Sequence, residues 1–265
     1  MYQKMDKYFV VGNNSSKSLS PMIFNYWFKK YKIDAKYSFI ELNDKSFNKD
    51  IKEILTKKNV SGLNITIPFK EKIIKHVDVL DEHSEVINAT NCLSIGKKIK
   101  GINTDWLGYY KTLPKHLNLA KKKVVLIGYG GAAYAIHYVL KKKGFNNITI
   151  INRTKKALKF EKQAKQTQGY DRFEEIIKSA KLIINTTPIN PIKNDLINRV
   201  SSDAILSDIV YSPKETSFLR NFPNNKKIYG ISMLLEQAAL CFKFWFGFEP
   251  VIDRNLIENL DKQIK

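Results

Sequence analysis

Cysteine is nearly absent from the sequence, and this absence is the first guide to the class of protein. The 265 residues contain two cysteines, Cys92 and Cys241. Two are too few for a framework of disulfide bonds, so a cytoplasmic location is expected. The chain opens with MYQKMDKYFVV, which lacks the long apolar core of a signal peptide. No zinc-finger spacing of cysteine and histidine occurs, and no metal is expected.

Acidic residues and arginine are also scarce. Lysine and arginine number 45 against 25 aspartates and glutamates, which gives a formal net charge of +20, but only five of the 45 are arginines. Nucleic-acid recognition usually recruits the planar guanidinium group, often with interleaved aromatics, whereas the lysines here are spread along the whole chain. We therefore expect no nucleic-acid partner, although the positive charge should attract anionic ligands.

Long hydrophobic runs are missing as well. The best candidate, residues 124–140, is largely apolar and has lysines on both sides. It contains glycines and His137, and it is shorter than the roughly 20 residues that a helix needs to span a bilayer. No membrane partner is expected, because a strand, a turn and a helix explain this run better.

A strand–helix–strand pattern surrounds this run. The apolar and β-branched segments predict a buried strand, a helix and a second strand at residues 124–127, 132–140 and 148–151. Gly128, Gly130 and Ala133 fit G-x-G-x-x-G/A between the first strand and the helix. The glycines allow a tight turn and a close approach of the backbone to a pyrophosphate, which the free N–H groups of the helix start would face. A dinucleotide site is predicted; the alternative is a tight turn in some other α/β protein.

The end of the second strand indicates which dinucleotide binds. Chains that bind NAD usually place an acidic residue there for the ribose 2′-hydroxyl, whereas arginine accommodates a 2′-phosphate. Here the strand ends in Asn152-Arg153-Thr154, followed by two lysines, and no carboxylate occurs before Glu161. Arg153 can clamp a phosphate with its planar fork, and Thr154 can add a hydroxyl. NADP is the predicted cofactor; the alternative is that Arg153 is a solvated surface charge.

Two serines near the N-terminus form a second candidate site. A strand is predicted at residues 7–11, followed by a polar loop that ends in Ser18-Leu19-Ser20-Pro21. Ser20 is predicted to cap a helix over residues 22–31, with Pro21 at its first position. Capping alone would explain Ser20, but the hydroxyls of Ser18 and Ser20 at a helix N-terminus can also hold an anion or a polyol.

Polar residues also mark the ends of two further segments. The strand predicted at residues 62–67 carries Asn64 and Thr66, and Lys70 follows it, while Asp105 ends a second such edge. Polar side chains at the C-terminal edge of a sheet suit a ligand site. A single lysine is normally a solvated surface charge, and Asp105 can simply cap a helix that begins at residue 106. Both interpretations stay open on these residues alone.

The remaining pattern alternates strands and helices, which predicts an α/β fold with parallel sheets. Further strands are expected at residues 37–42, 182–185 and 204–210, and a hairpin at residues 87–95 and 98–102. Further helices are expected at residues 46–57, 156–166, 173–180, from about 216, 232–246 and 253–264.

Nine motifs in one order give the chain a resemblance to a known family. They are Ser18-x-Ser20-Pro21, Asn64-x-Thr66-x-Pro68-x-Lys70, Asn91, Gly101-x-Asn103-Thr104-Asp105, Gly128-x-Gly130-Gly131-Ala132, Asn152-Arg153-Thr154, Asn185-Thr186-Thr187-Pro188, Asp208-x-x-Tyr211-x-Pro213 and Gly230-x-x-Met233-x-x-x-Gln237. With these motifs the chain resembles the NADP-dependent shikimate dehydrogenases over nearly its whole length.

The resemblance implies an N-terminal α/β substrate domain and a Rossmann-like NADP-binding domain, with the C-terminal helices returning to the first domain. It implies domains at residues 1–105, with 240–265 packing back on them, and at 106–239. It also implies reversible reduction of 3-dehydroshikimate to shikimate by NADPH, with Lys70 and Asp105 as the catalytic pair. The residues implied to hold this small-molecule substrate are Ser18, Ser20, Thr66, Lys70, Asn91, Asp105, Tyr211 and Gln237. Those implied to bind NADP are Gly128, Tyr129, Gly130, Gly131, Ala132, Asn152, Arg153, Thr154, Ile209 and Gly230.

The chemistry fits these residue types. Hydride transfer to a ketone leaves charge on oxygen, so a nearby ammonium group stabilises the transition state, and a proton must also arrive. Lys70 can do both while Asp105 orients it. The alternatives are a quinate/shikimate dehydrogenase of broader scope and a non-catalytic dinucleotide-binding relative; the presence of both Lys70 and Asp105 argues against the latter. The sequence leaves open whether the protein is a monomer or a homodimer.

Overall fold

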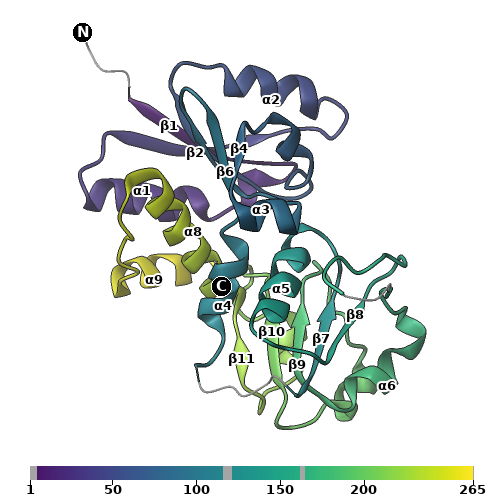
Figure 1. Cartoon of the computed structure of the whole chain (residues 1–265). Helices are drawn as coiled ribbons and strands as arrows, with labels where there is room; N and C mark the ends of the chain where they lie inside the picture. Colours follow the sequence, from purple (N-terminus) through teal and green to yellow (C-terminus); the bar gives the residue numbers. More distant parts are fainter. Residues whose placement is uncertain (1–4, 116–120, 162–164, 265) are drawn as a thin grey trace. The chain divides into compact units, whose positions relative to one another are not determined.

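The computed structural model describes residues 5–115, 121–161 and 165–264. The chain divides into two compact units (Figure 1). The first unit contains the described residues up to Asp105 together with Gln237–Leu260, and the second contains those of Trp106–Glu236 and from Asp261 onward. Sequence analysis expected the returning segment to begin at residue 240 and to run to the C-terminus.

The first unit is built on a six-stranded sheet in the order β2–β1–β3–β5–β6–β4. Its strands are β1 (Asp6–Gly12), β2 (Ala35–Glu41), β3 (Val60–Ile65), β4 (Val79–Leu80), β5 (Cys92–Ile95) and β6 (Ile99–Ile102). Strands β2 and β3 run parallel to β1, but β5 is antiparallel to both β3 and β6. The sheet is therefore mixed rather than parallel throughout, because the short turn between β5 and β6 joins them as a hairpin.

Helices cover this sheet through aromatic and aliphatic side chains. They are α1 (Ser20–Lys30), α2 (Phe47–Leu55), α3 (Glu82–Ile87), the C-terminal part of α8 (Gly230–Phe246) and α9 (Arg254–Asp261), with 3-10 turns at Ser15–Lys17 and Lys72–His76. On α1, Phe24 stacks on Tyr37 of β2, with ring centroids 4.5 Å apart. On α8, Trp245 donates a hydrogen bond to the carbonyl of Leu93 at 2.9 Å. These contacts hold two segments far apart in the sequence on one sheet.

The strand expected from residue 87 begins later than predicted. Residues 82–87 form helix α3, whose N-cap Asp81 accepts a hydrogen bond from the backbone N–H of Ser84. The helix ends at Asn88, which adopts the left-handed conformation with φ of 56°, as asparagine tolerates. The strand then starts at Cys92, so Asn91 lies on the connection into the sheet rather than within a long strand.

The second unit is built on a parallel five-stranded sheet in the order β11–β10–β9–β7–β8. Its strands are β7 (Lys123–Ile127), β8 (Ile148–Ile151), β9 (Ala180–Asn185), β10 (Ile205–Asp208) and β11 (Lys227–Ile228). The chain passes from β7 outward to β8 and then returns to β9 on the other side of β7. In such open sheets ligands bind beyond the carboxyl ends of the strands at this point of reversal. A cofactor site is therefore expected beyond the carboxyl ends of β7 and β9.

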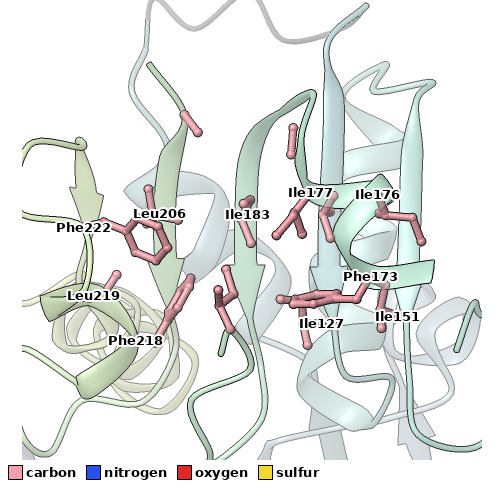
Figure 2. Packing of buried hydrophobic residues seen from close by; sticks show 14 residues of the cluster. Ile127, Ile151, Phe173, Ile176, Ile177, Ile183, Leu206, Phe218, Leu219 and Phe222 are labelled. Carbon is pink, nitrogen blue, oxygen red and sulfur yellow. The ribbon is translucent and has the colours of Figure 1, made fainter. Parts of the chain in front are cut away.

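Apolar side chains fill the space between this sheet and its helices. The helices assigned wholly to the second unit are α5 (Gly131–Lys142), α6 (Phe173–Ile177) and α7 (Ser217–Arg220); 3-10 turns lie at Tyr170–Arg172 and Asn194–Arg199, and α4 (Asp105–Thr112) follows the first unit. Figure 2 shows Phe173 of α6 and Phe218 of α7 directed toward the side chains of the strands. Near-continuous Ile, Leu and Val in these strands are typical of a sheet buried on both faces.

The helix expected at residues 156–166 is wrong. Ala157 pairs with Gln166 in an antiparallel bridge, and the backbone N–H of Leu158 bonds the carbonyl of Lys165 at 2.9 Å. Thr167 adds a hydroxyl that accepts from the N–H of Lys156 at 3.0 Å. Helix propensity differs among such residues by only tenths of a kcal/mol, so these tertiary pairings outweigh it. Residues 162–164 of the expected helix lie outside the described residues.

None of the helices in the described ranges combines the length and apolarity needed to cross a membrane. The longest in sequence, α8, spans Gly230–Phe246. Its residues up to Glu236 group with the second unit and those from Gln237 with the first. Gln237 and Cys241 lie four residues apart and therefore share one face of this helix. That face contributes polar atoms to a cluster at the end of β3.

Candidate active site

A buried ion pair lies at the end of β3 in the first unit. The Nζ atom of Lys70 is 2.6 Å from Oδ2 of Asp105, and the two side chains are 12% and 5% exposed. A solvated surface charge does not fit this lysine. Breaking a buried pair by removing one partner strands the other charge, which is strongly unfavourable. The structure thus brings together two residues that lie 35 positions apart.

Asn91 holds the second oxygen of this carboxylate. Its Nδ2 donates to Oδ1 of Asp105 at 2.9 Å and to Oε1 of Gln237 at 3.2 Å. Its Oδ1 accepts from the backbone N–H of Thr104 at 2.7 Å. Both oxygens of Asp105 are therefore engaged by side chains, which a role in helix capping alone would not require. Lys70, Asn91, Asp105 and Gln237 form one polar cluster.

Asn91 is also supported by a group of buried polar atoms. Asn64 on β3 donates to the carbonyl of Asn91 at 3.0 Å and to Sγ of Cys241 at 3.0 Å. Its own oxygen accepts from the Tyr37 hydroxyl at 2.7 Å. Thr104 Oγ1 lies 3.2 Å from the same sulfur. Buried polar groups need such partners, and this network fixes Asn91 from below.

Tyr37 and Cys241 contact the polar cluster through Asn64, and neither was among the residues predicted from the sequence. The four-residue spacing from Gln237 to Cys241 on a helix was a usable signal, because it places both on one face. No comparable signal marks Tyr37, which resembles any other aromatic residue of a strand until the pairing of β2 with β1 is known.

The paired serines form a neighbouring group at the start of α1. Ser18 Oγ donates to Ser20 Oγ at 3.1 Å and accepts from the backbone N–H of Ser20 at 3.2 Å. Ser20 is the first residue of the helix, Leu19 takes the N-cap position, and no side chain caps it. The prediction that Ser20 is the N-cap is therefore wrong, because the Ser18 hydroxyl already accepts from the Ser20 N–H. The two hydroxyls face each other.

Thr66 lies at the end of β3, against the end of β1. A Cβ atom on Gly12 would lie 2.3 Å from Thr66 Cγ2, so a side chain at position 12 would displace that of Thr66. The N–H of Thr66 donates to the carbonyl of Val11 at 2.9 Å. Thr66 thus lies where the loop that leads to the serines leaves β1.

The glycine turn of the second unit follows β7. Gly128 has φ of +93°, and a Cβ there would lie 2.4 Å from Thr186 Oγ1, whereas a Cβ on Gly130 meets nothing within 4 Å. Gly130 is the N-cap of α5, whose first turn, starting with Gly131 and Ala132, carries no acidic residue. Open space beside free N–H groups at the positive end of a helix suits an anionic group. The turn therefore fits the pyrophosphate of a dinucleotide.

The segment after β8 carries exposed cationic side chains. Asn152 Nδ2 donates to the carbonyl of Thr154 at 2.7 Å and shapes the turn. Arg153 and Thr154 are exposed, and Arg153 lies close enough to Tyr170 to lower the pKa of that phenol, although burial, the larger effect, raises it. The Nζ atom of Lys156 donates to the carbonyl of Tyr129 in the glycine turn at 3.0 Å. Positive charge thus lies beside the turn.

A third loop of the second unit follows β10 and contains Ile209 and Tyr211. A Cβ on Gly230 would lie 2.5 Å from the carbonyl oxygen of Ile209, so the loop passes directly over the start of α8. Asp208 anchors it by accepting from Thr216 Oγ1 at 2.7 Å and from the N–H of Val210 at 3.0 Å. Burial raises the pKa of the Asp208 carboxyl, and these donors oppose the rise. Tyr211 belongs to this unit and is not grouped with Lys70.

Across the described ranges, no group of three or more His, Cys, Asp or Glu side chains is gathered as metal ligands. The cations of the two sites are lysine and arginine side chains.

Comparison with known proteins gives a consistent result. Residues 10–93 match the family model of the shikimate dehydrogenase substrate binding domain, and residues 111–209 match that of shikimate / quinate 5-dehydrogenase. A shikimate dehydrogenase (NADP(+)) of Pelagibacter ubique is 36% identical, over 96% of this chain and 98% of its own length.

Solved structures agree. The crystal structure of shikimate dehydrogenase from Aquifex aeolicus is 31% identical and covers 98% of each chain with a TM-score of 0.84. A shikimate dehydrogenase solved in complex with NADP+ is 28% identical, with a TM-score of 0.82 over 99% of this chain and 96% of its own. The predicted α/β fold, with a substrate domain and a Rossmann-like domain, is confirmed. With a relative above 30% identity over almost its full length, the chain belongs to the shikimate dehydrogenase family.

Proposed function

We propose that this protein is an NADP-dependent shikimate dehydrogenase that catalyses the reversible reduction of 3-dehydroshikimate to shikimate, a step toward chorismate and the aromatic amino acids. The observation that carries the proposal is the buried pair of Lys70 and Asp105, 2.6 Å apart. A protein that only binds a dinucleotide has no need to bury a lysine and a carboxylate at the end of a strand remote in sequence from its glycine turn. The interpretation without catalysis is thereby disfavoured.

Lys70 is the group that handles charge and the proton. Its ammonium stabilises the negative charge that grows on the carbonyl oxygen of the substrate, and it donates the proton that completes the hydroxyl. Asp105 holds Nζ in one place and is itself held by Asn91. In the reverse direction, the amino group of Lys70 is the proposed acceptor of the hydroxyl proton. Fixing both partners before substrate binds reduces the reorganisation that the reaction needs.

The remaining polar groups of the first unit suit a polyol that carries a carboxylate. Asn91 and Gln237 offer amide groups beside Asp105, and Ser18 and Ser20 offer two hydroxyls at a helix start. We assign the substrate to the first unit, within residues 1–105 and the segment from Gln237, with Thr66 as a further contact. Tyr211, on the loop after β10, is proposed as a further residue that holds the substrate.

The second unit suits NADP. The backbone at Gly128 and Gly130 and the start of α5 would hold the pyrophosphate, and Arg153 with Thr154 would hold the 2′-phosphate. Residues assigned to further cofactor contacts are Gly131, Ala132, Asn152, Ile209 and Gly230, together with Tyr129 through its backbone. When bound, NADPH supplies the hydride. We place the NADP domain in the second unit, within Trp106–Glu236, and we propose a cytoplasmic enzyme that acts as a monomer or homodimer.

The test is the absorbance of the reduced nicotinamide, measured with the purified full chain and shikimate or quinate offered against NADP+ or NAD+. Turnover confined to shikimate with NADP+ is expected. Turnover of quinate with NAD+ would favour the broader quinate/shikimate enzyme, because quinate carries an extra ring hydroxyl that the pocket must accommodate. Folded protein that turns over none of the four pairs would contradict catalysis and leave the dinucleotide-binding relative.

A further inference from the structure

A buried histidine beside the glycine turn has no part in the catalytic cluster around Lys70. His137 on α5 is fully buried, and its Nδ1 lies 3.1 Å from the hydroxyl of Tyr129, the residue between the two glycines of the turn. Within the described residues its Nε2 has no hydrogen-bond partner, although Glu161 Oε1 lies 3.5 Å away. Burying such a polar ring costs free energy. Its position against the glycine turn suggests that it stabilises the structure around that turn.

The direction of the bond to His137 follows from the other contact of the same hydroxyl. The backbone N–H of Lys159 donates to Tyr129 Oη at 2.9 Å, so the phenol accepts there and its proton is available for His137 Nδ1. Burial lowers the pKa of His137 to about 4, which leaves the ring neutral at pH 7. Neutral imidazole with its proton on Nε2 can accept at Nδ1. Lys159, Tyr129 and His137 therefore form one chain of hydrogen bonds.

This chain joins the turn to the segment that carries the cations. Lys156 adds a second link, since its Nζ bonds the carbonyl of Tyr129 at 3.0 Å. Phe160 stands edge-on to the His137 ring, with centroids 5.1 Å apart. Glu161 bonds Lys141 of α5 at 3.3 Å. The segment from Asn152 to Glu161 is thus attached to the turn and to α5 at several points.

These links connect the regions proposed to bind two different parts of NADP. The turn suits the pyrophosphate, and the start of the segment, with Arg153 and Thr154, suits the ribose 2′-phosphate. Selectivity for a 2′-phosphorylated nucleotide depends on the two parts being held at a fixed separation, because small misplacements weaken charge-assisted hydrogen bonds steeply. Exposed side chains such as that of Arg153 cannot fix this separation by themselves.

We propose that Tyr129 and His137 are positioning residues that set the preference for a 2′-phosphorylated nucleotide by holding residues 152–161 against the glycine turn. The proposal rests on the proposed NADP site and deepens it. Neither residue needs to touch the 2′-phosphate, because both act through the placement of the segment. Loss of the Tyr129 hydroxyl should therefore cost affinity at a group that it does not contact.

The test measures binding of nucleotide fragments rather than turnover. Adenosine 2′,5′-bisphosphate and adenosine 5′-monophosphate are titrated into the full chain by calorimetry. Tyr129→Phe keeps the ring and removes the hydroxyl, and Tyr138→Phe removes a hydroxyl elsewhere on α5 as the matched control. For Tyr129→Phe we expect about tenfold weaker binding of the bisphosphate, the size of one or two lost hydrogen bonds, with less than about twofold change for the monophosphate. Tyr138→Phe should match the wild type.

A second pair of variants guards against a folding defect. His137→Leu has no acceptor for the Tyr129 hydroxyl and should lose the preference for the bisphosphate, whereas His137→Asn can accept near the place of Nδ1 and should restore it. If Tyr129→Phe and His137→Leu both keep the wild-type preference for the bisphosphate, the positioning proposal is wrong but the NADP assignment stands. The same conclusion follows if these variants bind both fragments more weakly by the same factor. Equal binding of the two fragments by the wild type would overturn it together with the NADP assignment. Turnover with shikimate is judged separately.

Discussion

The two units share one arrangement at the place where each sheet reverses its strand order. β1 lies between β2 and β3 in the first unit, and β7 lies between β8 and β9 in the second. In both, a glycine lies against a threonine that comes after the third strand; Gly12 is the last residue of β1, and Gly128 directly follows β7. An added Cβ would lie 2.3 Å from Thr66 at Gly12 and 2.4 Å from Thr186 at Gly128. A close approach of glycine to threonine thus occurs in both units, although of these two glycines only Gly128 has a positive φ.

The two places differ in the segment that comes after the glycine. After Gly12 the chain continues through a polar loop whose hydroxyls, those of Ser18 and Ser20, lie at the start of α1. After Gly128 it reaches α5 within three residues and offers mainly backbone N–H groups. The sheet continues with antiparallel β5 in the first unit and with parallel β10 in the second.

The proposed ligands of the two units differ in the same way. In the first unit the proposed substrate contacts are individual side chains, and a buried network fixes those of Asn91 and Asp105. Backbone N–H groups recognise phosphate collectively, with exposed cations added at the rim. Single side-chain changes should therefore damage the first site severely and the second in graded steps.

Removing the Lys70 charge should produce the largest effect. For Lys70→Met we expect turnover to fall by about 10²–10⁴-fold, the range of general acid–base catalysis, with NADP+ affinity unchanged because we assign the nucleotide to the second unit. Steady-state kinetics and calorimetry measure the two quantities. Lys70→Arg keeps a cation for Asp105 but does not release a proton at neutral pH, so it should retain thermal stability and still lose turnover.

The matched control for Lys70 is its neighbour Lys72. It pairs with Asp44 at 2.6 Å, but both side chains are about half exposed, at 46% and 59%, and exposed pairs contribute little. Lys72→Ala should leave turnover within about twofold of the wild type. Full activity in Lys70→Met, or an equal loss of turnover in Lys72→Ala, would contradict the claim that the buried pair, unlike an exposed pair, is needed for turnover.

Acid should weaken the second unit through His137. The unfolded chain takes up this proton near pH 6.5, the native chain near pH 4, so native stability falls as the pH drops through that interval. The loss approaches about 3 kcal/mol. Native-state hydrogen exchange of the β7 amides, compared at pH 7 and pH 4.5, measures it, and His137→Leu should flatten the dependence. Asp253, whose pKa is held at about 2 chiefly by Lys30, titrates below this window.

Removing Arg153 should have the smallest effect of the three and should act on one cofactor. For Arg153→Ala we expect about tenfold weaker binding of NADP+, the size of a lost hydrogen bond to a charged group, and less than about twofold change for NAD+. Arg172→Ala is the control, because Arg172 is exposed and pairs with Glu175 at 3.0 Å. Equal weakening of NADP+ and NAD+ would exclude Arg153 from contact with the 2′-phosphate.

Regular elements were the most predictable part of the molecule. The strand at residues 148–151 has the bounds expected from its β-branched run, because a buried parallel strand leaves an unbroken apolar pattern. The helix predicted from residue 156 was wrong because the local sequence does not decide the conformation there. Its Lys, Ala and Gln favour a helix only weakly, and pairing with Thr167 and its neighbours decides the conformation.

The sites divide in the same way. Lys70, Asp105 and the glycine turn could be named as candidates because each follows a recognisable strand, and the resemblance to a known family then implied that Lys70 and Asp105 act as a pair. The contacts that complete them could not, since they join residues brought together by strand order. Tyr37 reaches Asn64 across the sheet at 2.7 Å, and the N–H of Lys159 reaches the Tyr129 hydroxyl from a segment expected to be helical. A backbone N–H leaves no mark in the sequence.

Both thiols of the chain belong to the first unit. Cys92 on β5 and Cys241 on α8 are fully buried, and burial also raises the pKa of the Cys92 thiol. An alkylating reagent therefore reaches them only during openings of that unit. The rate at which the intact mass increases during alkylation therefore reports how often the first unit opens. The second unit contains neither cysteine and does not contribute, so the wild-type chain allows the opening of one unit to be followed without an added label.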